Sequence, residues 1–407
     1  MNLLKLSWSN IRHKPLNTLL STILLAFGIG IISMMLLLKS QLSEKFDRNI
    51  KDIDFVLAAK GSPLQSMLAN IYHVDVPTGN IKVSEARRII KNPMVAEAIP
   101  LAYGDNYEKF RIVGTNEKYP NHYGCKLAEG NLFAAPFEVT IGSSVAKESG
   151  LKVGSTFTSM HGYDNAADDA DAHHHQQLTV VGIFEQSNSV IDNLILTPVE
   201  TTWLVHEHGE EHPADDSLTT DSAHVEPERE MTAYLIKKRN KGAFGMLSKQ
   251  TEDTTMQLAN VAVENSRLMN NFGIGLSTIT AIAIVIMIIS FISIFISLYN
   301  SMRERRYELA LMRTMGGSRG TLFALIIQEG LLLVLLGYAA GLALSRAGLL
   351  ALSHFMKESF HVGLDNLGVG AQELMLLGLT LLVGLLASVL PARQALKIDI
   401  SKTLSDA

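Results

Sequence analysis

The sequence predicts a membrane protein of the α+β class, with four transmembrane helices in a one-plus-three order and a large mixed α/β extracytoplasmic domain between helices one and two. Three observations lead to this prediction. Hydrophobic residues make up 47% of the 407 residues and are concentrated in four long apolar runs. Basic residues gather beside the ends of these runs. The segment 39–271 instead contains short β-branched runs bounded by turn residues, which are typical of strands.

The first segment, 1–15, is predicted to be a cytoplasmic amphipathic helix. Leu4, Trp8 and Ile11 fall on one helical face, and three basic residues surround them. A basic helix with a tryptophan on its apolar face is typical of the membrane interface, so we expect this segment to lie there before the first span.

Four segments are long and apolar enough to span a bilayer, namely 16–38, 272–299, 322–345 and 374–392. The first has about 23 residues and would cover about 35 Å, which exceeds a hydrocarbon core of about 30 Å. It is too long for the apolar core of a signal peptide, and no small-x-small cleavage site follows it. We therefore expect it to stay attached as an anchor.

The basic residues predict the side of the membrane on which each loop lies. They precede the first span, follow the fourth in 393–407, and include five arginines in the loop 300–321. The loop 346–373 has only Arg346 and Lys357. By the positive-inside rule, both termini and the loop 300–321 are cytoplasmic, and 346–373 is a short periplasmic loop. We expect a multi-pass protein of the cell inner membrane with 39–271 in the periplasm.

Several runs within 39–271 predict the elements of a folded domain. Six runs are predicted strands: 53–58, 110–115, 137–142, 178–184, 193–198 and 231–238. Segments 83–91 and 143–150 are predicted helices, and so is a long stretch from 242 to about 270 that leads directly into the second span. This last helix and the span would form one continuous rod. The remainder is predicted to be a mixed α+β domain with two lobes.

Motifs at several points of the chain, in a fixed order, carry a family resemblance. They are WSNIRHKPLNTLLSTILLAFGIG, VTIGSSVAKESGLKVGSTF, LTVVGIFEQSNSVIDNLILTP, RRYELALMRTMGGSRGTLF, QEGLLLVLLGYAAGLAL and LPARQALKIDISKTLS. Together they resemble the FtsX/MacB/LolC type of ABC transporter permease over nearly the whole chain. The resemblance implies a MacB-like periplasmic domain, here with His/Asp-rich loops. It also implies a permease subunit that transmits ATP-driven motion of a partner ATPase to that domain (mechanotransmission), without a substrate crossing the bilayer.

In this family the loop between spans two and three is a coupling helix that docks into a separate ATPase. Leu309, Met312 and Met315 recur at helical spacing in the loop 300–321, which predicts an apolar stripe flanked by arginines. A groove in a partner would cover this stripe, whereas the alternative is a helix that lies on the membrane with its arginines near lipid headgroups. Gly316 would end the helix. The predicted ATPase-coupling residues are Arg306, Glu308, Leu309, Met312, Arg313, Met315 and Gly316.

No G-x-x-x-x-G-K-[ST] motif occurs in the sequence, so we expect ATP hydrolysis on a separate subunit and no catalytic residue or covalently bound cofactor here. Glu329 lies in the third span. Because a charge is costly in the bilayer, we expect it to face protein or water, with a role in helix packing or coupling rather than proton transport. Four glycines are expected helix-packing contacts, namely Gly337, Gly341, Gly378 and Gly384.

Eight of the 13 histidines fall between His161 and His224, among many carboxylates. Such mixtures suit zinc, copper or nickel. Six candidate histidines are the proposed ligands: His173, His174, His175, His206, His208 and His212. The flexible composition leaves three interpretations open, which are loose metal binding, solvated loops without a ligand, and an ordered zinc site. The stretch VLAAKGSPLQSMLANIYHVDVPTGNI resembles a subgroup of these permeases associated with zinc-responsive transport and histidine-rich partners. That resemblance makes a metal, or a metal-carrying periplasmic partner, the expected cargo or signal.

Three other functions remain open. A LolC-type permease would extract lipoprotein or lipid through an apolar groove, an FtsX-type permease would regulate a periplasmic enzyme, and a membrane sensor would use no ATPase. The expected partners are an ABC ATP-binding subunit, a second permease copy in a homodimer or heterodimer, a periplasmic or outer-membrane protein, and the lipid bilayer. The net charge of −5 gives no indication of nucleic acid. The single cysteine, Cys125, excludes an intramolecular disulfide and a cysteine-based zinc motif.

Overall fold

The computed structural model describes residues 6, 7, 9, 15–161, 177–207, 228–360 and 368–396. The chain forms two compact units. We call Met1–Ser43 with Asn271–Ala407 the helical unit, and Glu44–Asn270 the sheet unit. Each is described by itself below.

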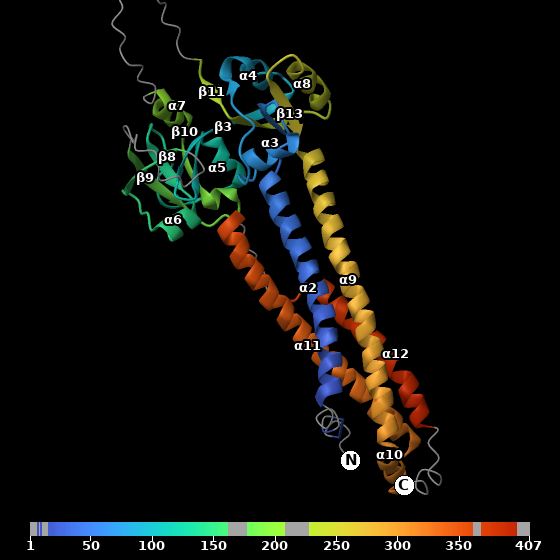
Figure 1. The fold of residues 1–407 in the computed structure, drawn as a ribbon. Coiled ribbons are helices and arrows are strands. Elements are labelled where there is room, and N and C mark those ends of the chain that lie inside the picture. Colours follow the sequence, from blue (N-terminus) through green and yellow to red (C-terminus); the bar gives the residue numbers. More distant parts are fainter. Residues whose placement is uncertain are drawn as a thin grey trace, which may run out of the picture. The chain divides into compact units, whose positions relative to one another are not determined.

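Four helices in the described residues are long and apolar enough to cross a membrane. They are α2 (Pro15–Ile50), α9 (Val261–Glu304), α11 (Arg319–Phe360) and α12 (Ala371–Ala395), and the short α10 (Arg306–Thr314) joins α9 to α11 (Figure 1). The one-plus-three order is the predicted one. The helices extend beyond the predicted spans, however, and the loop predicted to begin at 346 remains helical as far as Phe360.

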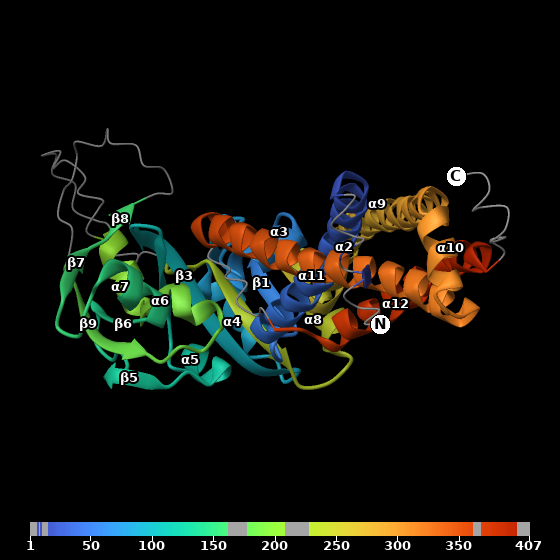
Figure 2. The same cartoon turned by 90° about the horizontal axis from the view of Figure 1, so that it is seen from below.

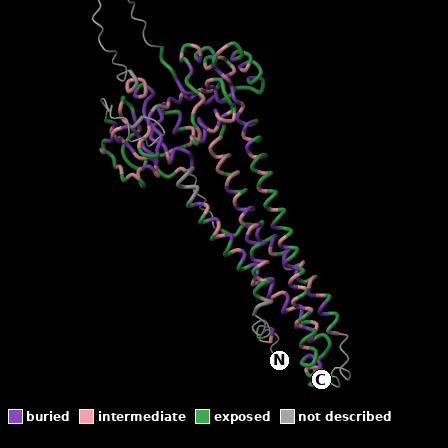
Figure 3. Tube along the Cα trace, in the orientation of Figure 1, coloured by how far each residue is buried: buried purple, intermediate pink, exposed green. Residues whose placement is uncertain are grey.

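The helical unit has an apolar core to which all four long helices contribute. Leu25 and Ile29 of α2 pack with Met287 of α9, Val334 of α11 and Leu376 of α12. Exposed and buried residues alternate along these helices, because one side of each faces its neighbours (Figure 3).

Glycines allow the backbones of this unit to approach closely. A Cβ at Gly341 would lie 2.9 Å from the carbonyl oxygen of Ala26, and one at Gly30 would lie 3.1 Å from that of Gly341. Gly337 and Gly384 are likewise in contact with neighbouring helices, as predicted. For Gly378 the prediction is wrong within this chain, because no described atom lies within 4 Å of a Cβ built there.

The sheet unit is built on one large mixed sheet with the strand order β13-β1-β12-β3-β4-β10-β6-β9-β5. The strands are β1 (Phe55–Ala59), β2 (Ile81–Lys82), β3 (Val95–Tyr107), β4 (Phe110–Thr115), β5 (Leu127–Gly130), β6 (Glu138–Ile141), β7 (Thr156–Thr158), β8 (Met160–His161), β9 (Gln177–Phe184), β10 (Leu194–Pro198), β11 (Glu230–Met231), β12 (Ala233–Lys238) and β13 (Met256–Asn260). All six predicted strands are present. The long strand β3 connects the two ends of the sheet, because its first half pairs with β12 and its second half with β4.

Shorter helices complete the sheet unit. They are α3 (Pro63–Asn70), α4 (Val83–Ile90), α5 (Lys118–Tyr123), α6 (Ser143–Ser149), the 3₁₀ turn η1 (Val190–Asn193), α7 (Val199–Glu207) and α8 (Ala243–Thr251). The helices predicted at 83–91 and 143–150 are confirmed. The long helix predicted from 242 to 270 is wrong in its middle, because α8 ends at Thr251 and β13 follows. Its continuation into the second span is confirmed, because α9 runs without a break from Val261 to Glu304. The side chains of Met256 and Leu258 are buried as β13 pairs with β1, so sheet pairing overrides the local helical pattern.

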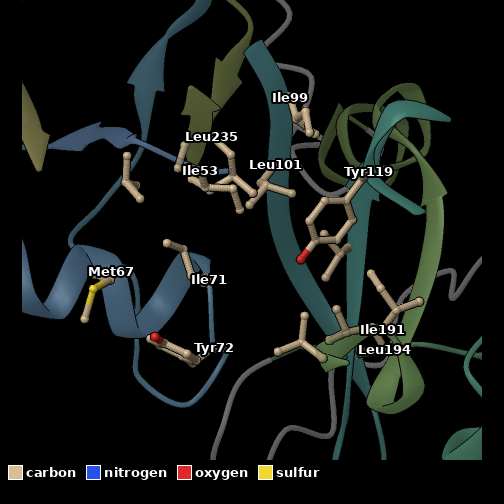
Figure 4. Close-up of a cluster of buried hydrophobic side chains, with 14 of the residues drawn as sticks. Ile53, Met67, Ile71, Tyr72, Ile99, Leu101, Tyr119, Ile191, Leu194 and Leu235 are labelled. Carbon is tan, nitrogen blue, oxygen red and sulfur yellow. The ribbon is translucent and has the colours of Figure 1, made fainter. Parts of the chain in front are cut away.

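Strand β1 shows how the sheet acquires a core on both faces. Because side chains alternate along a strand, Val56 packs on the face that holds α3, while Phe55 and Leu57 pack with α4 and α8 on the other. Figure 4 shows the first of these clusters, in which side chains of α3, β3, β12 and α5 gather.

Candidate functional site

Helix α10 begins at a sharp turn and ends at a glycine. α9 ends at Glu304, and Arg305 leaves helical geometry before α10 starts. Gly316 follows α10 with φ of +94°, while the amides of Gly316 and Gly317 donate to the carbonyls of Arg313 (3.2 Å) and Met312 (2.9 Å). This pattern is a Schellman ending, in which only glycine adopts the left-handed position without strain. The predicted helix stop at Gly316 is confirmed.

The inward face of α10 is held by the bundle. Leu309 is buried with Met302 of α9, Leu322 and Leu325 of α11 and Ala392 of α12, and the half-buried Met312 packs at the edge of this cluster. α10 therefore lies at the end of the bundle where α12 also ends (Figure 2). Leu309 and Met312 cover the bundle rather than offering a free surface.

The outward face of α10 carries a different apolar stripe. Tyr307 is 49% exposed, Leu311 43% and Met315 72%, and these residues recur at i, i+4 and i+8. Of the predicted stripe, only Met315 lies on this face, which we call the outward stripe. Leu311 and Tyr307 were missed, because helical spacing alone does not say which of two apolar faces the bundle covers.

The charged residues of this region form a link between α10 and α11. Glu329 is 6% exposed, and its carboxylate lies 3.8 Å from the guanidinium of Arg305. Arg305 also donates to Glu308 at 3.0 Å. Glu329 thus faces protein, as expected, and joins α11 to the turn before α10. Arg306 and Glu308 are exposed, and Arg313 is half-buried.

A second polar cluster lies where the start of α12 meets the middle of α11, and it was not predicted from the sequence. Arg346 and Glu373 form a bidentate pair with both N–O distances at 2.7 Å. The hydroxyl of Ser33 in α2 donates to Glu373 and lies 3.0 Å from that of Ser345. We call Ser33, Ser345, Arg346 and Glu373 the polar clasp. Glu373 stands three residues after Gly370 at the start of α12, a capping pattern that could have directed attention to it.

The sheet unit contains one notable buried titratable cluster. The Nε2 atom of His73 lies 2.6 Å from the hydroxyl of Tyr119, and its Nδ1 atom lies 3.0 Å from that of Tyr103. Burial, with a smaller contribution from the charge of Arg111, holds the pKa of His73 well below 6.5. His73 also has a left-handed φ of +56°.

The described residues contain no group of three or more His, Cys, Asp or Glu side chains placed to hold a metal ion. Of the six candidate histidines, His206 lies in α7, and the other five lie outside the described residues. The predicted metal site therefore stays a prediction.

Comparison with known proteins places the chain. Residues 18–233 match the MacB-like periplasmic core domain, and residues 280–400 match the FtsX-like permease C-terminal domain. The first match alone covers more than half of the chain. The chain belongs to the MacB/FtsX-like permease family. The protein is thus a MacB-like ABC transporter permease, and its four long apolar helices are the spans of a multi-pass membrane protein.

The curated relatives are distant. The macrolide export ATP-binding/permease protein MacB of Neisseria gonorrhoeae (strain ATCC 700825 / FA 1090) is 22% identical over 347 residues, which are 80% of this chain and 49% of the relative. Its counterpart in Neisseria meningitidis serogroup B (strain ATCC BAA-335 / MC58) is 23% identical over 348 residues, with the same coverage. The chain thus spans about half the length of the curated relatives it matches.

Two solved structures are similar in part. The periplasmic region of MacB from Actinobacillus actinomycetemcomitans is 12% identical with a TM-score of 0.35, over 55% of this chain and 96% of that one. The extracellular domain of the noncanonic ABC-type transporter YknZ from Gram-positive bacteria is 10% identical with a TM-score of 0.31, over 51% and 99%.

Proposed function

We propose that this permease works with a separate ABC ATP-binding subunit that docks on α10, and that it transmits the motion of that subunit to the sheet unit. The outward stripe carries this proposal. Tyr307, Leu311 and Met315 stay exposed although the inward face of the same short helix is fully used by the bundle. Anchors at i, i+4 and i+8 suit a helix that lies in a groove of a partner protein.

A membrane surface would also accept an apolar stripe, and one charge of α10 supports a protein partner instead. Glu308 is exposed beside the outward stripe; its carboxylate accepts from Arg305 at 3.0 Å and would still face the anionic headgroups that attract basic helices. A protein groove can instead offer a matching donor to this carboxylate. The name of the curated relatives joins an ATP-binding part to a permease, and we propose that a separate chain supplies the ATP-binding part here.

The orientation follows from the same proposal. We place α10 and both termini in the cytoplasm and the sheet unit in the periplasm of an inner-membrane protein, in agreement with the arginines of the loop 300–321. We further propose a second permease copy, in a homodimer or heterodimer, and a periplasmic or outer-membrane partner. The six candidate histidines support zinc-linked transport as the cargo hypothesis. LolC-type extraction of lipoprotein or lipid and FtsX-type regulation are the alternatives.

The docking proposal is tested by placing a charge in the outward stripe. Leu311→Asp and Met315→Asp should each weaken docking about 30-fold, since an anchor of this kind contributes about 2 kcal/mol. Both variants should still insert, because neither position lies in a membrane span. The measurements are co-purification of the ATP-binding subunit from detergent extracts and ATP turnover of the purified complex.

Ser318→Asp is the matched control. It adds the same charge beyond Gly316, and aspartate can replace the Ser318 hydroxyl, which accepts from the amide of Thr321 at 3.2 Å as the cap of α11. The control should co-purify like the wild type. Unchanged co-purification and turnover in both stripe variants would reject docking on α10. A wild-type chain that carries no ATPase at all would favour the sensor function.

A further inference from the structure

The polar clasp contains one pair that is fixed within α11 and α12. Besides its two bonds to Glu373, Arg346 donates to the carbonyl oxygen of Gly368 at 3.0 Å. Besides Arg346, Glu373 accepts from the amide of Gly370 at 3.2 Å, and Tyr338 of α11 donates to its backbone carbonyl at 2.9 Å. Both charges would therefore keep partners if α2 were absent.

Helix α2 enters the clasp through one neutral hydroxyl. Ser33 is fully buried, donates to the Glu373 carboxylate, accepts from Arg346 at 3.4 Å and lies beside the Ser345 hydroxyl. Nearer α10, α2 approaches α11 closely at Gly30 and Gly341, and the side chains that pack around this contact are apolar. A movement of α2 against the other two helices would thus break a hydroxyl contact and leave the ion pair intact.

A released Ser33 would also have a partner. Serines within helices can donate to the carbonyl four residues earlier. Two buried serines of this unit already do so, since Ser290 donates to Ile286 and Ser388 to Gly384, both at 2.7 Å. Ser33 could turn in the same way to the carbonyl of Ile29. Ser345 would lose the Ser33 hydroxyl in that arrangement, and it could turn in the same way to the carbonyl of Gly341. All members of the clasp could thus be hydrogen-bonded in both arrangements.

We propose that Ser33 is a releasable catch, by which α2 is held to the fixed Arg346–Glu373 pair in one state of the transport cycle and freed in another. The inference rests on the proposed function for its place in the cycle. An element that switches needs two arrangements that both satisfy its polar groups. For the catch, the observed bond to Glu373 is one, and a bond to the carbonyl of Ile29 would be the other. A static staple would instead hold α2 in every state.

A disulfide distinguishes a catch from a staple. In a Cys125→Ser background, Ser33→Cys with Ser345→Cys brings two thiols to where the hydroxyls lie 3.0 Å apart, within reach of a disulfide bond of about 2.05 Å. Oxidation with diamide should lower ATP turnover of the complex at least fivefold while the ATPase still co-purifies, and dithiothreitol should restore turnover. The single-cysteine variants are the controls for the oxidant. Full turnover with the disulfide formed would overturn the catch.

A second measurement needs no ATPase and so separates this inference from the proposed function. In the same Cys125→Ser background, the purified Ser33→Cys variant should react with N-ethylmaleimide at least tenfold faster than the purified Ser290→Cys variant. Both serines are fully buried, but among the described residues Ser290 bonds to Ile286 of its own helix. Equal labelling rates would show that α2 stays in place and would overturn the catch, whatever the ATPase does. If no ATPase co-purifies with the wild type, the proposed function is rejected, but the catch is not.

Discussion

The contact between α2 and α11 at Gly341 predicts a measurable loss of stability on adding one methyl group. In Gly341→Ala the new Cβ would lie 2.9 Å from the carbonyl oxygen of Ala26 and 2.9 Å from the Cβ of Ile29. The Ala26 oxygen is a backbone atom of α2, and the Cβ of Ile29 is fixed to that backbone. No rotamer change can therefore relieve the contact, and α2 must shift. Such overpacking costs about 1–3 kcal/mol. Against this, alanine removes a helix penalty of glycine of about 1 kcal/mol.

Gly378→Ala isolates the second contribution, because no described atom lies within 4 Å of its Cβ. The difference between the two variants should therefore equal the overpacking alone, a change of about 5- to 150-fold in the folded-to-unfolded ratio. The assay is reversible unfolding of the full chain in mixed micelles, followed by circular dichroism. Gly378→Ala should match or exceed the wild type, and Gly341→Ala should fall below both. Equal stability of the two variants would refute the close packing of α2 on α11.

Three further predictions concern topology, pH and metal. Lys91 and Arg319 are both exposed, so each can be replaced by cysteine in a Cys125→Ser background. An impermeant maleimide should label Lys91→Cys in intact spheroplasts and Arg319→Cys only after lysis. The reverse pattern would invert the proposed orientation. Because the pKa of His73 is lowered below the unfolded value of about 6.5, the unfolded chain binds the extra proton first, so stability should fall by up to about 1.4 kcal/mol per unit as the pH drops below 6.5. His73→Asn, which tolerates the left-handed φ, should flatten that slope, and an unchanged slope in unfolding titrations would contradict the assignment. Calorimetry should show Zn²⁺ uptake at neutral pH and release near pH 5, where protons compete for imidazole. Replacing the six candidate histidines should remove most of the Zn²⁺ uptake. Equal uptake without them would favour the lipid or lipoprotein alternative.

The sequence was sufficient for the parts of the fold that depend on local pattern. Long apolar runs predicted the four spans, and β-branched runs predicted six strands, because burial in lipid or in a sheet requires those residues at those spacings. The failure at 242–270 has a physical reason. The residues of β13 become a strand only because β1 offers an unpaired edge, and β1 is about 200 residues away in sequence.

The sequence predicted where α10 lies in the chain, but not which of its faces is exposed. Gly316 ends α10 as predicted, and Glu329 faces protein as predicted. Whether the Leu309 face or the Leu311 face is buried, however, depends on Leu322 and Leu325 of α11 and on Ala392 of α12. These residues come later in the sequence and cover the Leu309 face once α11 and α12 have packed. The polar clasp was missed for the same reason, because Ser33 and Glu373 are 340 positions apart. Pairings of this kind leave no periodic signal.

Two ion pairs that involve α11 assign a common role to this helix. Glu329 and Arg346 lie about 26 Å apart along it at 1.5 Å per residue, close to the thickness of the hydrocarbon core. Each charge thus lies near one end of the apolar stretch, where a buried charge is least costly, and each is paired with a different element: Glu329 with the turn before α10, Arg346 with α12. Because removing one partner of a buried pair leaves the other charge uncompensated, at about 3–5 kcal/mol, neither joint separates easily. In the proposed function, a displacement of α10 would therefore reach α12 through α11, and the proposed catch at Ser33 is where α2 would follow that movement or be released from it.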